Sequence, residues 1–212
     1  MENALILIFQ LVVLIFSVMI HEISHGYVAE RLGDPTARLA GRLTLNPLKH
    51  LDPFGSVLLP VMLYFLTGGG FVFGWAKPVP YNPFNLKNPE VGGGKIAAAG
   101  PISNLLIAVV FGVLLRVVEG LGAATPLTVL FGVVVYLNIL LAVFNLVPLP
   151  PLDGSKVLFA LLPDTPGART LRFFLEQYGM FLLLLFIFFG FHLIVPVIRY
   201  LFLLIAGNPF GF

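Results

Sequence analysis

The sequence predicts an all-α polytopic membrane protein, a bundle of transmembrane helices with one small β-like or re-entrant element. Hydrophobic residues make up 58% of the 212 residues and charged residues only 10%, whereas soluble domains carry roughly 25% charged residues. The apolar residues also gather in runs long enough to cross a bilayer. We therefore expect one integral membrane domain, 1–212, with a core at about 4–162, a final membrane helix at about 178–206 and no large soluble appendage.

Four apolar runs predict the membrane helices. They are residues 4–31, 96–118, 127–147 and 178–206. The first run ends before Gly33-Asp34-Pro35, which is a helix stop. It lacks the basic start and the small-residue cleavage site of a signal peptide, so we expect it to be retained. Proline interrupts the last run at Pro196.

A shorter apolar run, residues 54–66, lies between Gly55 and three consecutive glycines that begin at Gly68. At this length it predicts either a short span or a re-entrant segment. Phe71, Phe73 and Trp75 alternate in the Gly- and Pro-rich stretch that follows. This alternation favours an extended, β-like segment.

Basic residues predict the orientation of the helices. Ten of the twelve Lys and Arg residues follow the first run, precede the second or follow the third: Arg31, Arg38, Arg42, Lys49, Lys77, Lys87, Lys95, Lys156, Arg169 and Arg172. The N-terminus and the connection at 120–126 contain none. By the positive-inside rule, the N-terminus is external and the end of the first helix is cytoplasmic. We expect the plasma membrane of a prokaryote as the location.

A candidate metal site lies inside the first apolar run, in His21-Glu22-Ile23-Ser24-His25. Two histidines four residues apart project from one face of a helix, the spacing at which both can bind one zinc ion. Glu22 is positioned to take a proton from a water molecule that the metal holds. Ionisable residues inside a membrane are candidates for function, and the absence of cysteine excludes thiolate ligands and disulfides.

A catalytic zinc ion needs a third protein ligand, for which Asp153 is the best candidate. It follows the third run and the proline-rich segment 148–151, at the same membrane end as the two histidines. Broken backbone at membrane depth is tolerated where it lines a protein cavity. His50, Asp52 and His192 are weaker candidates, and a role for Asp153 as a helix cap is the structural alternative.

Together these motifs resemble the site-2 protease family of intramembrane zinc metalloproteases. The resemblance covers roughly residues 5–162 and rests on HExxH together with Asn-x-x-Pro-x-x-x-Leu-Asp-Gly at 145–154. Segments 46–55 and 74–80 resemble the compact prokaryotic branch, and Gly100-Pro101-Ile102-Ser103-Asn104 matches a core-helix motif. At 212 residues we expect neither a PDZ nor a CBS domain in addition to the membrane helices.

The resemblance implies that His21, His25 and Asp153 hold one zinc ion per chain and that Glu22 is the general base. It also implies that Asn145 stabilises the oxyanion, although an interhelical hydrogen bond is the structural alternative. For Asn104, helix packing is favoured over a catalytic role.

The expected function is hydrolysis of peptide bonds in transmembrane segments of substrate proteins, near the cytoplasmic side. The expected partners are a transmembrane protein substrate and the lipid bilayer, with no nucleic acid and an undetermined oligomeric state. The alternative is a zinc-binding transporter or an inactive relative that binds membrane segments without cutting them. Such a protein has no need for Glu22 between the two histidines.

Overall fold

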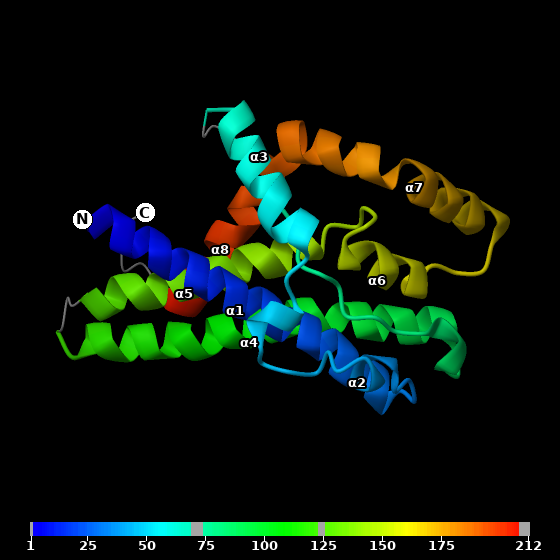
Figure 1. Cartoon of the computed structure of the whole chain (residues 1–212), viewed down its shortest axis with the longest axis horizontal. Coiled ribbons are helices and arrows are strands. Elements are labelled where there is room, and N and C mark those ends of the chain that lie inside the picture. Colours follow the sequence, from blue (N-terminus) through cyan, green and yellow to red (C-terminus); the bar gives the residue numbers. More distant parts are fainter. Residues whose placement is uncertain (1, 69–73, 123–125, 208–212) are drawn as a thin grey trace.

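The computed structural model describes residues 2–68, 74–122 and 126–207, and helices dominate these three ranges (Figure 1). No strand is assigned within them. The α-helices are α1 (Glu2–Arg31), α2 (Thr36–Leu39), α3 (Leu59–Leu66), α4 (Pro89–Gly120), α5 (Pro126–Asn145), α6 (Asp153–Leu161), α7 (Pro166–Leu185) and α8 (Val195–Ala206). The predicted all-α class is confirmed.

Four helical stretches of the described residues are long and apolar enough to cross a membrane: Ala4–Arg31, Pro89–Gly120, Pro126–Asn145 and Pro166–Leu193. The second begins at Pro89 rather than at residue 96, because the Asn88 side chain caps the Val91 N–H and a proline occupies the first helical turn. The protein is therefore an integral membrane protein.

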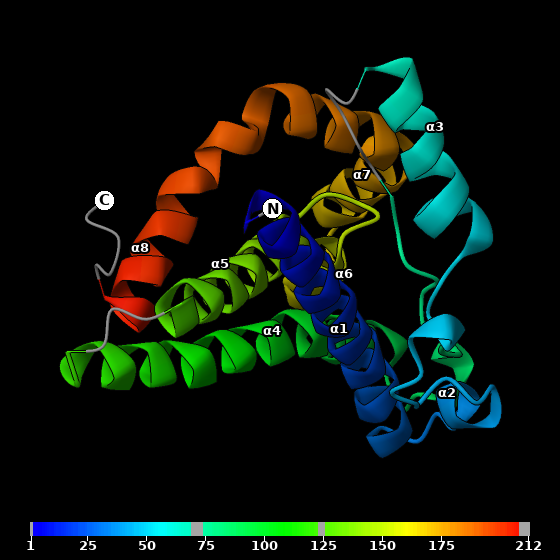
Figure 2. The ribbon, with the colours of Figure 1, turned by 60° about the vertical axis from the view of Figure 1, so that its left-hand side comes forward.

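The C-terminal region differs from the single helix expected at 178–206. A helix begins much earlier, at Pro166, and passes through two short helical turns that end at Leu193. The separate helix α8 then starts at Val195, with Pro196 in its first turn, where the missing N–H is not needed. Figure 2 shows α7 and α8 forming an arch beside the other helices.

The core of the bundle is built around α4, which contacts α1, α5, α6 and α8. Figure 2 shows α1 crossing α4 and α5 steeply. A cluster of buried apolar side chains joins α4, α5 and the C-terminal helix: Ala108, Leu115, Val135, Ile139, Ile194, Ile198, Phe202 and Ala206. Gly112 lets α8 approach, because a Cβ there would lie 2.4 Å from Ile205 Cγ2. These contacts hold α4 and α5 against each other under α1.

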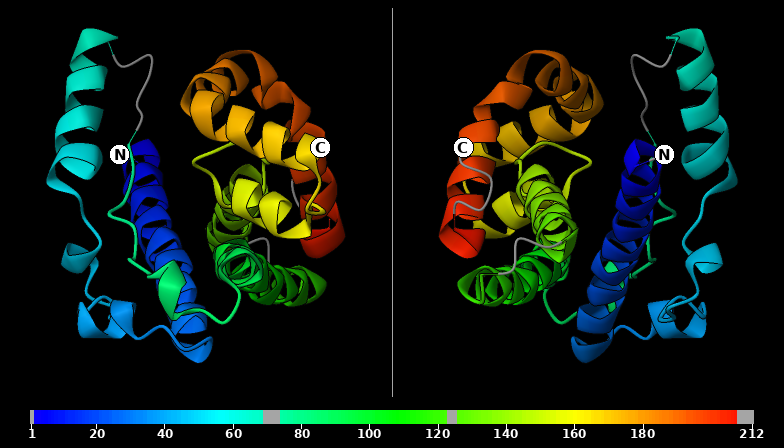
Figure 3. Two further views of the ribbon diagram at one scale, coloured as in Figure 1. Left: turned by 90° about the vertical axis from the view of Figure 1, so that its right-hand side faces the viewer. Right: turned by 90° about the vertical axis from the view of Figure 1, so that its left-hand side faces the viewer.

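The short apolar run forms a helix over Pro53–Leu66, the second part of which is α3. Its two parts contain 6 and 8 residues, so it would rise only about 21 Å against an apolar bilayer thickness of about 30 Å. Figure 3 shows α3 on the α1 side of the molecule, away from α4 and α5. These dimensions favour the re-entrant interpretation over a full span.

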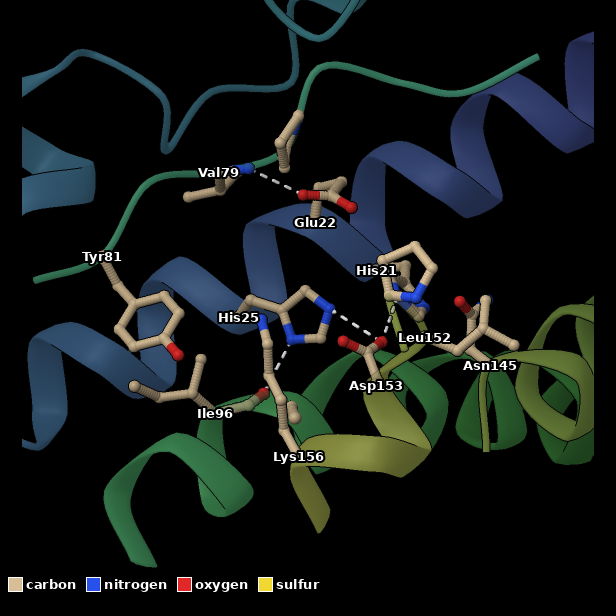
Figure 4. Close-up of a pocket in the computed structure, with 13 residues that line it drawn as sticks. His21, Glu22, His25, Val79, Tyr81, Ile96, Asn145, Leu152, Asp153 and Lys156 are labelled. Atoms are coloured by element: carbon tan, nitrogen blue, oxygen red, sulfur yellow. Dashed lines mark hydrogen bonds and ion pairs between the residues drawn. The ribbon is translucent and has the colours of Figure 1, made fainter. Parts of the chain in front are cut away.

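Residues 74–82, which we call the strap, run without helical structure past the metal-motif part of α1 (Figure 4). Every second backbone N–H of the strap, from Trp75 to Lys77 to Val79, donates inward to the rest of the protein. The acceptors are Gly55 O at 3.1 Å, His50 O at 2.9 Å and Glu22 Oε2 at 2.8 Å, in that order. This alternation is typical of an extended strand.

The strap thus has β-like geometry although no ladder is assigned in the described ranges. Two of the three alternating aromatic residues that suggested it, Phe71 and Phe73, lie outside the described residues.

Both ends of the strap are tied to the loops that follow α1. At its start, the buried Arg42 donates from Nη2 to Lys77 O at 2.7 Å. At its end, the fully buried Asp34 accepts from Asn82 N at 2.6 Å and from Asn85 Nδ2 at 2.7 Å. Asp34 also accepts from the backbone N–H and the hydroxyl of Thr36. The position of the strap over α1 is therefore fixed from two sides.

Candidate metal centre

The two histidines of the HExxH motif lie on one face of α1, as the helical period requires. His21 and His25 are both buried, at 5% and 9% exposure. Their rings stand nearly perpendicular, with an interplanar angle of 88° and ring centroids 4.6 Å apart. Figure 4 shows both rings turned toward Asp153.

Asp153 meets both histidines through a single oxygen. Its Oδ2 atom lies 3.0 Å from His21 Nε2 and 3.2 Å from His25 Nε2. Two ligand atoms bound tetrahedrally to one zinc ion at about 2.0–2.1 Å lie about 3.3 Å apart. The two distances from Asp153 Oδ2 to the histidine nitrogens are therefore close to those of a zinc site.

Helix α4 fixes the orientation of both rings from below. His25 Nδ1–H donates to Ile96 O at 2.7 Å, and His21 Nδ1 contacts Asn104 Oδ1 at 2.6 Å. Between them lies Gly100, where a Cβ would lie 2.5 Å from the His21 ring and 2.6 Å from the His25 ring. We call Ile96, Gly100 and Asn104, which are spaced by four residues along α4, the floor of the site. Only a residue without a side chain fits at its centre.

These contacts bear on which nitrogen of each ring can accept. A backbone carbonyl can only accept, so His25 carries a proton on Nδ1, and its neutral form has the lone pair on Nε2. If His21 has the same tautomer, two imidazole lone pairs and one carboxylate oxygen converge on one point. Such an arrangement is favourable when a cation lies between the three groups. The donor set of two imidazoles and one carboxylate suits zinc, so the residues fit the metal that the motif predicts.

Asp153 reaches the histidines because the chain reverses sharply after α5. The proline-containing turn at 146–152 ends in Leu152, and α6 begins at Asp153 itself. A Cβ at Gly154 would lie 2.2 Å from Leu146 O, so the next residue has to be glycine for the turn to close. The residue at the cap position is Leu152, and no side chain caps this helix. The structure therefore gives no support to a capping role for Asp153.

Glu22 points away from Asp153 and toward the strap (Figure 4). Its Oε2 atom accepts the Val79 N–H at 2.8 Å. A carboxylate oxygen of Glu22 also lies within 4.8 Å of the ligand nitrogens of the two histidines. Glu22 is thus beside the predicted metal position and held by backbone, as a general base needs to be.

A cavity of about 170 Å³ opens at this centre. The two histidines, Glu22 and Asp153 line it, together with Asn145, Tyr81 and Lys156 (Figure 4). Lys156 Nζ lies 5.2 Å from the centre of the Tyr81 ring. Asn145 donates from Nδ2 to Leu141 O at 2.8 Å, one turn back in its own helix. No hydrogen bond from its amide to another helix is present among the described residues, so the interhelical alternative gains no support.

The weaker ligand candidates lie elsewhere. His50 is buried and donates from Nε2 to Thr44 O at 2.9 Å, which makes it part of the loop under the strap. Asp52 caps the helical turn that follows it, accepting from the Phe54 and Gly55 N–H groups. His192 lies in the short turn before α8 and does not line the cavity.

Sequence reasoning assigned Asn104 to helix packing, and its amide does donate to Ser17 O on α1 and to Asn138 Oδ1 on α5. Its oxygen also contacts a histidine of the motif, which that reasoning missed. A signal for this was present. Asn104 is four residues after Gly100, so both lie on the same face of one helix. The strap contact to Glu22 had no comparable signal, because it joins a loop backbone to a side chain 57 residues away.

Comparison with known proteins places this chain in a family. The model of peptidase family M50 matches residues 9–129 and 117–187. The Bacillus subtilis protein "Putative zinc metalloprotease YwhC" is 42% identical over 179 residues, which is 82% of this chain and 77% of that protein. The Mycolicibacterium smegmatis protein "Putative zinc metalloprotease Rip2" is 32% identical over 157 residues, covering 73% of this chain and 58% of that protein. No solved structure gives a significant match.

Proposed function

The chain belongs to peptidase family M50, a zinc-dependent family, and we propose that it is an intramembrane endopeptidase. It cuts peptide bonds in transmembrane segments of substrate proteins, near the cytoplasmic side of the membrane. One observation carries the proposal. Two histidine nitrogens lie within 3.2 Å of one aspartate oxygen in a bundle of membrane-length helices, and a separate carboxylate lies beside them.

In this proposal His21, His25 and Asp153 hold one zinc ion. When bound there, such an ion would lower the pKa of a bound water molecule toward about 7 and would polarise the scissile carbonyl. Glu22 accepts the proton of the attacking water and returns it to the leaving amine. The Val79 N–H holds one Glu22 oxygen at 2.8 Å, which leaves the other free for the proton.

Asn145 is the proposed donor to the oxyanion. Its amide carries two N–H groups, and the one hydrogen bond described for it goes to Leu141 O within the same helix. The second N–H can therefore point into the cavity that Asn145 lines. A donor placed before the reaction stabilises developing charge without reorganisation.

A helical substrate has to unwind at the site, because its peptide carbonyls are otherwise engaged in intrahelical bonds. The strap offers a surface for the extended form. Its inward N–H groups at alternate residues are occupied, and Pro78 and Pro80 have no N–H. The edge that faces away thus presents carbonyls to the N–H groups of a substrate that adds as a strand.

The orientation is part of the proposal. Ten of the twelve basic residues follow the first apolar run, precede the second or follow the third. In Figure 1 the end of α1, α2 and the starts of α4 and α7 lie toward one end of the bundle, while the start of α1 and the end of α4 lie toward the other. The positive-inside rule makes the basic end cytoplasmic, in the plasma membrane of a prokaryote. The cysteine-free chain allows a direct test. If Lys49→Cys were labelled from outside intact cells, the true orientation would be the reverse of the proposed one.

Glu22 also lies close enough to the histidines to serve as a third ligand in place of Asp153. That arrangement would suit a zinc carrier or an inactive relative, because no base would remain. We expect Asp153→Ala to lose most of the bound zinc and Glu22→Gln to retain it. Metal analysis of the two purified variants decides between the two ligand sets.

The decisive measurement is cleavage of a transmembrane substrate by the Glu22→Gln variant. The amide is nearly isosteric but cannot accept the proton, so we expect a loss of at least about a hundredfold with zinc retained. Glu30→Gln is the matched control, since Glu30 lies on the same helix and pairs with Arg38 outside the site. If Glu22→Gln cut as fast as the parent with full zinc content, the protease proposal would be wrong.

A further inference from the structure

A chain of buried amides runs from the interior of the bundle to His21. Asn104 on α4 and Asn138 on α5 are both fully buried, and Ser17 on α1 is buried beside them. Asn104 Nδ2 donates to Asn138 Oδ1 at 2.9 Å and to Ser17 O at 3.3 Å. Asn138 Nδ2 donates to Val134 O and to Ser17 Oγ, both at 2.9 Å. At the other end, Asn104 Oδ1 contacts His21 Nδ1.

The hydrogen-bond directions in this chain are determined by its backbone acceptors. Val134 O can only accept, so it requires the NH₂ side of the Asn138 amide, and the Asn138 oxygen then faces Asn104. That oxygen and Ser17 O both require donors, so Asn104 presents its NH₂ group to them. The Asn104 oxygen is left for His21, whose Nδ1 must therefore carry the proton. In the neutral ring that a metal ion requires, the lone pair of His21 is then on Nε2, the atom that faces Asp153.

We propose that Asn104, oriented by Asn138 and Ser17, is a positioning residue that selects the metal-binding tautomer of His21. The inference rests on the zinc centre of the proposed function and deepens it. A histidine ligand usually donates its other N–H to a carboxylate, a carbonyl or water, which fixes the ring and its tautomer. Here a neutral amide chain supplies that acceptor, and no additional charge is placed within the membrane.

The arrangement of the buried amides indicates that they do more than hold the helices together. Three helices place buried polar groups at one point, and the backbone acceptors orient the two amides so that the Asn104 oxygen faces His21 Nδ1. A chain that served helix association alone would have no reason to end on a histidine of the metal motif. Ser103, the neighbour of Asn104, provides a contrast because its hydroxyl donates only to Gly100 O within α4.

The test measures zinc affinity of the full-length purified protein by competition with a chelator, without any substrate. Asn104→Leu removes the acceptor and should weaken zinc binding by about ten- to a hundredfold. Asn104→Asp keeps an acceptor for His21, so it should bind zinc more tightly than Asn104→Leu, although its metal-free form should be less stable. Ser103→Ala is the matched control and should match the parent.

The contribution of Asn138, which acts on His21 through Asn104, can be tested separately. Asn138→Leu should weaken zinc binding less than Asn104→Leu, because it only frees the Asn104 amide to turn over. In the double variant the Asn138 change should add nothing, since residues that act through one another are not additive. The absorption spectrum of the cobalt-substituted protein should change in Asn104→Leu and not in Ser103→Ala.

Parent-like zinc affinity in Asn104→Leu would overturn the inference, as would equal losses in Asn104→Leu and Asn104→Asp. Additive losses of zinc affinity in Asn104→Leu and Asn138→Leu would show that Asn138 does not act through Asn104 and that the two amides only pack the helices together. Because zinc affinity is read without cleavage, the outcome is separate from the proposed function. If the parent protein never cleaved a substrate but its variants showed the expected zinc affinities, the protease proposal would be wrong and the inference about Asn104 would stand.

Discussion

The floor and the strap enclose the same candidate metal centre, yet they are built in different ways. The floor is one face of α4, with Ile96, Gly100 and Asn104 spaced by one helical turn and in contact with both histidines. The strap is a loop held by separate hydrogen bonds to Gly55, His50, Arg42 and Asp34. It meets the site chemistry through the Val79 N–H.

This difference indicates a division of labour. A helix face cannot shift one contact without shifting the others, which suits the fixed geometry that a metal ion demands. A loop held by individual bonds can be displaced at lower cost, which suits the side on which a substrate backbone has to enter. We therefore expect changes in the floor to alter zinc binding and changes in the strap to alter turnover with zinc retained.

The largest effect is expected at the centre of the floor. In Gly100→Ala the new Cβ would lie 2.5 Å from the His21 ring and 2.6 Å from the His25 ring. Overpacking of this kind costs about 1–3 kcal/mol, and here it falls on two ligands, so zinc affinity should drop by about a hundredfold. Gly120→Ala is the matched control, because that glycine ends the same helix with nothing within 4 Å. Normal zinc affinity in Gly100→Ala would mean that α4 does not support the site rigidly.

A smaller effect is expected for the strap, and it should fall on cleavage rather than on zinc affinity. Val79→Pro removes the N–H that Glu22 accepts, in a segment already flanked by Pro78 and Pro80. A hydrogen bond to a charged group contributes about 1.5–3 kcal/mol, so cleavage should fall about tenfold or more while zinc affinity stays at the parent level. Val79→Ala keeps the N–H and serves as control. If the proline variant lost zinc instead, floor and strap would not be separate.

The smallest effect on cleavage is expected at the anchor of the strap. Asp34 lies beyond the membrane-length part of α1 and is buried; burial by itself raises its pKa, but hydrogen bonds from Thr36, Asn85 and the Asn82 N–H outweigh this and hold the pKa below its usual range. Asp34→Asn places an NH₂ group against those donors. It should destabilise the protein by about 1–3 kcal/mol and lower cleavage only a few-fold, with zinc retained.

The pH dependence of this loss gives the sharper test. A carboxylate with a depressed pKa in the folded state stabilises that state above its unfolded pKa of about 3.9, and the contribution disappears as the pH falls through the folded value. The unfolding temperatures of the parent and of Asp34→Asn should therefore differ by a constant amount at pH 5–7. The two curves should converge below about pH 4. A difference that does not change over this range would show that the charge of Asp34 is not what holds the strap.

Much of this molecule follows from local sequence patterns. Apolar runs predict the membrane helices because length and composition alone decide whether a segment can cross a bilayer. The four-residue spacing of His21 and His25 places both on one helix face whatever the rest of the chain does. Asp153 was predictable as their partner, because the proline-rich break before it marks non-helical backbone near the same end of the bundle.

Only the tertiary structure decided the surroundings of those residues. The tautomer of His21 depends on Asn104 and Asn138, which lie 83 and 117 residues from it along the chain and meet only through the packing of three helices. The place of the strap depends on Asp34, whose loop position gives no hint of the backbone groups that it accepts from. Helical periodicity is a property of neighbouring residues, whereas hydrogen-bond partners across a bundle are set by how its elements pack.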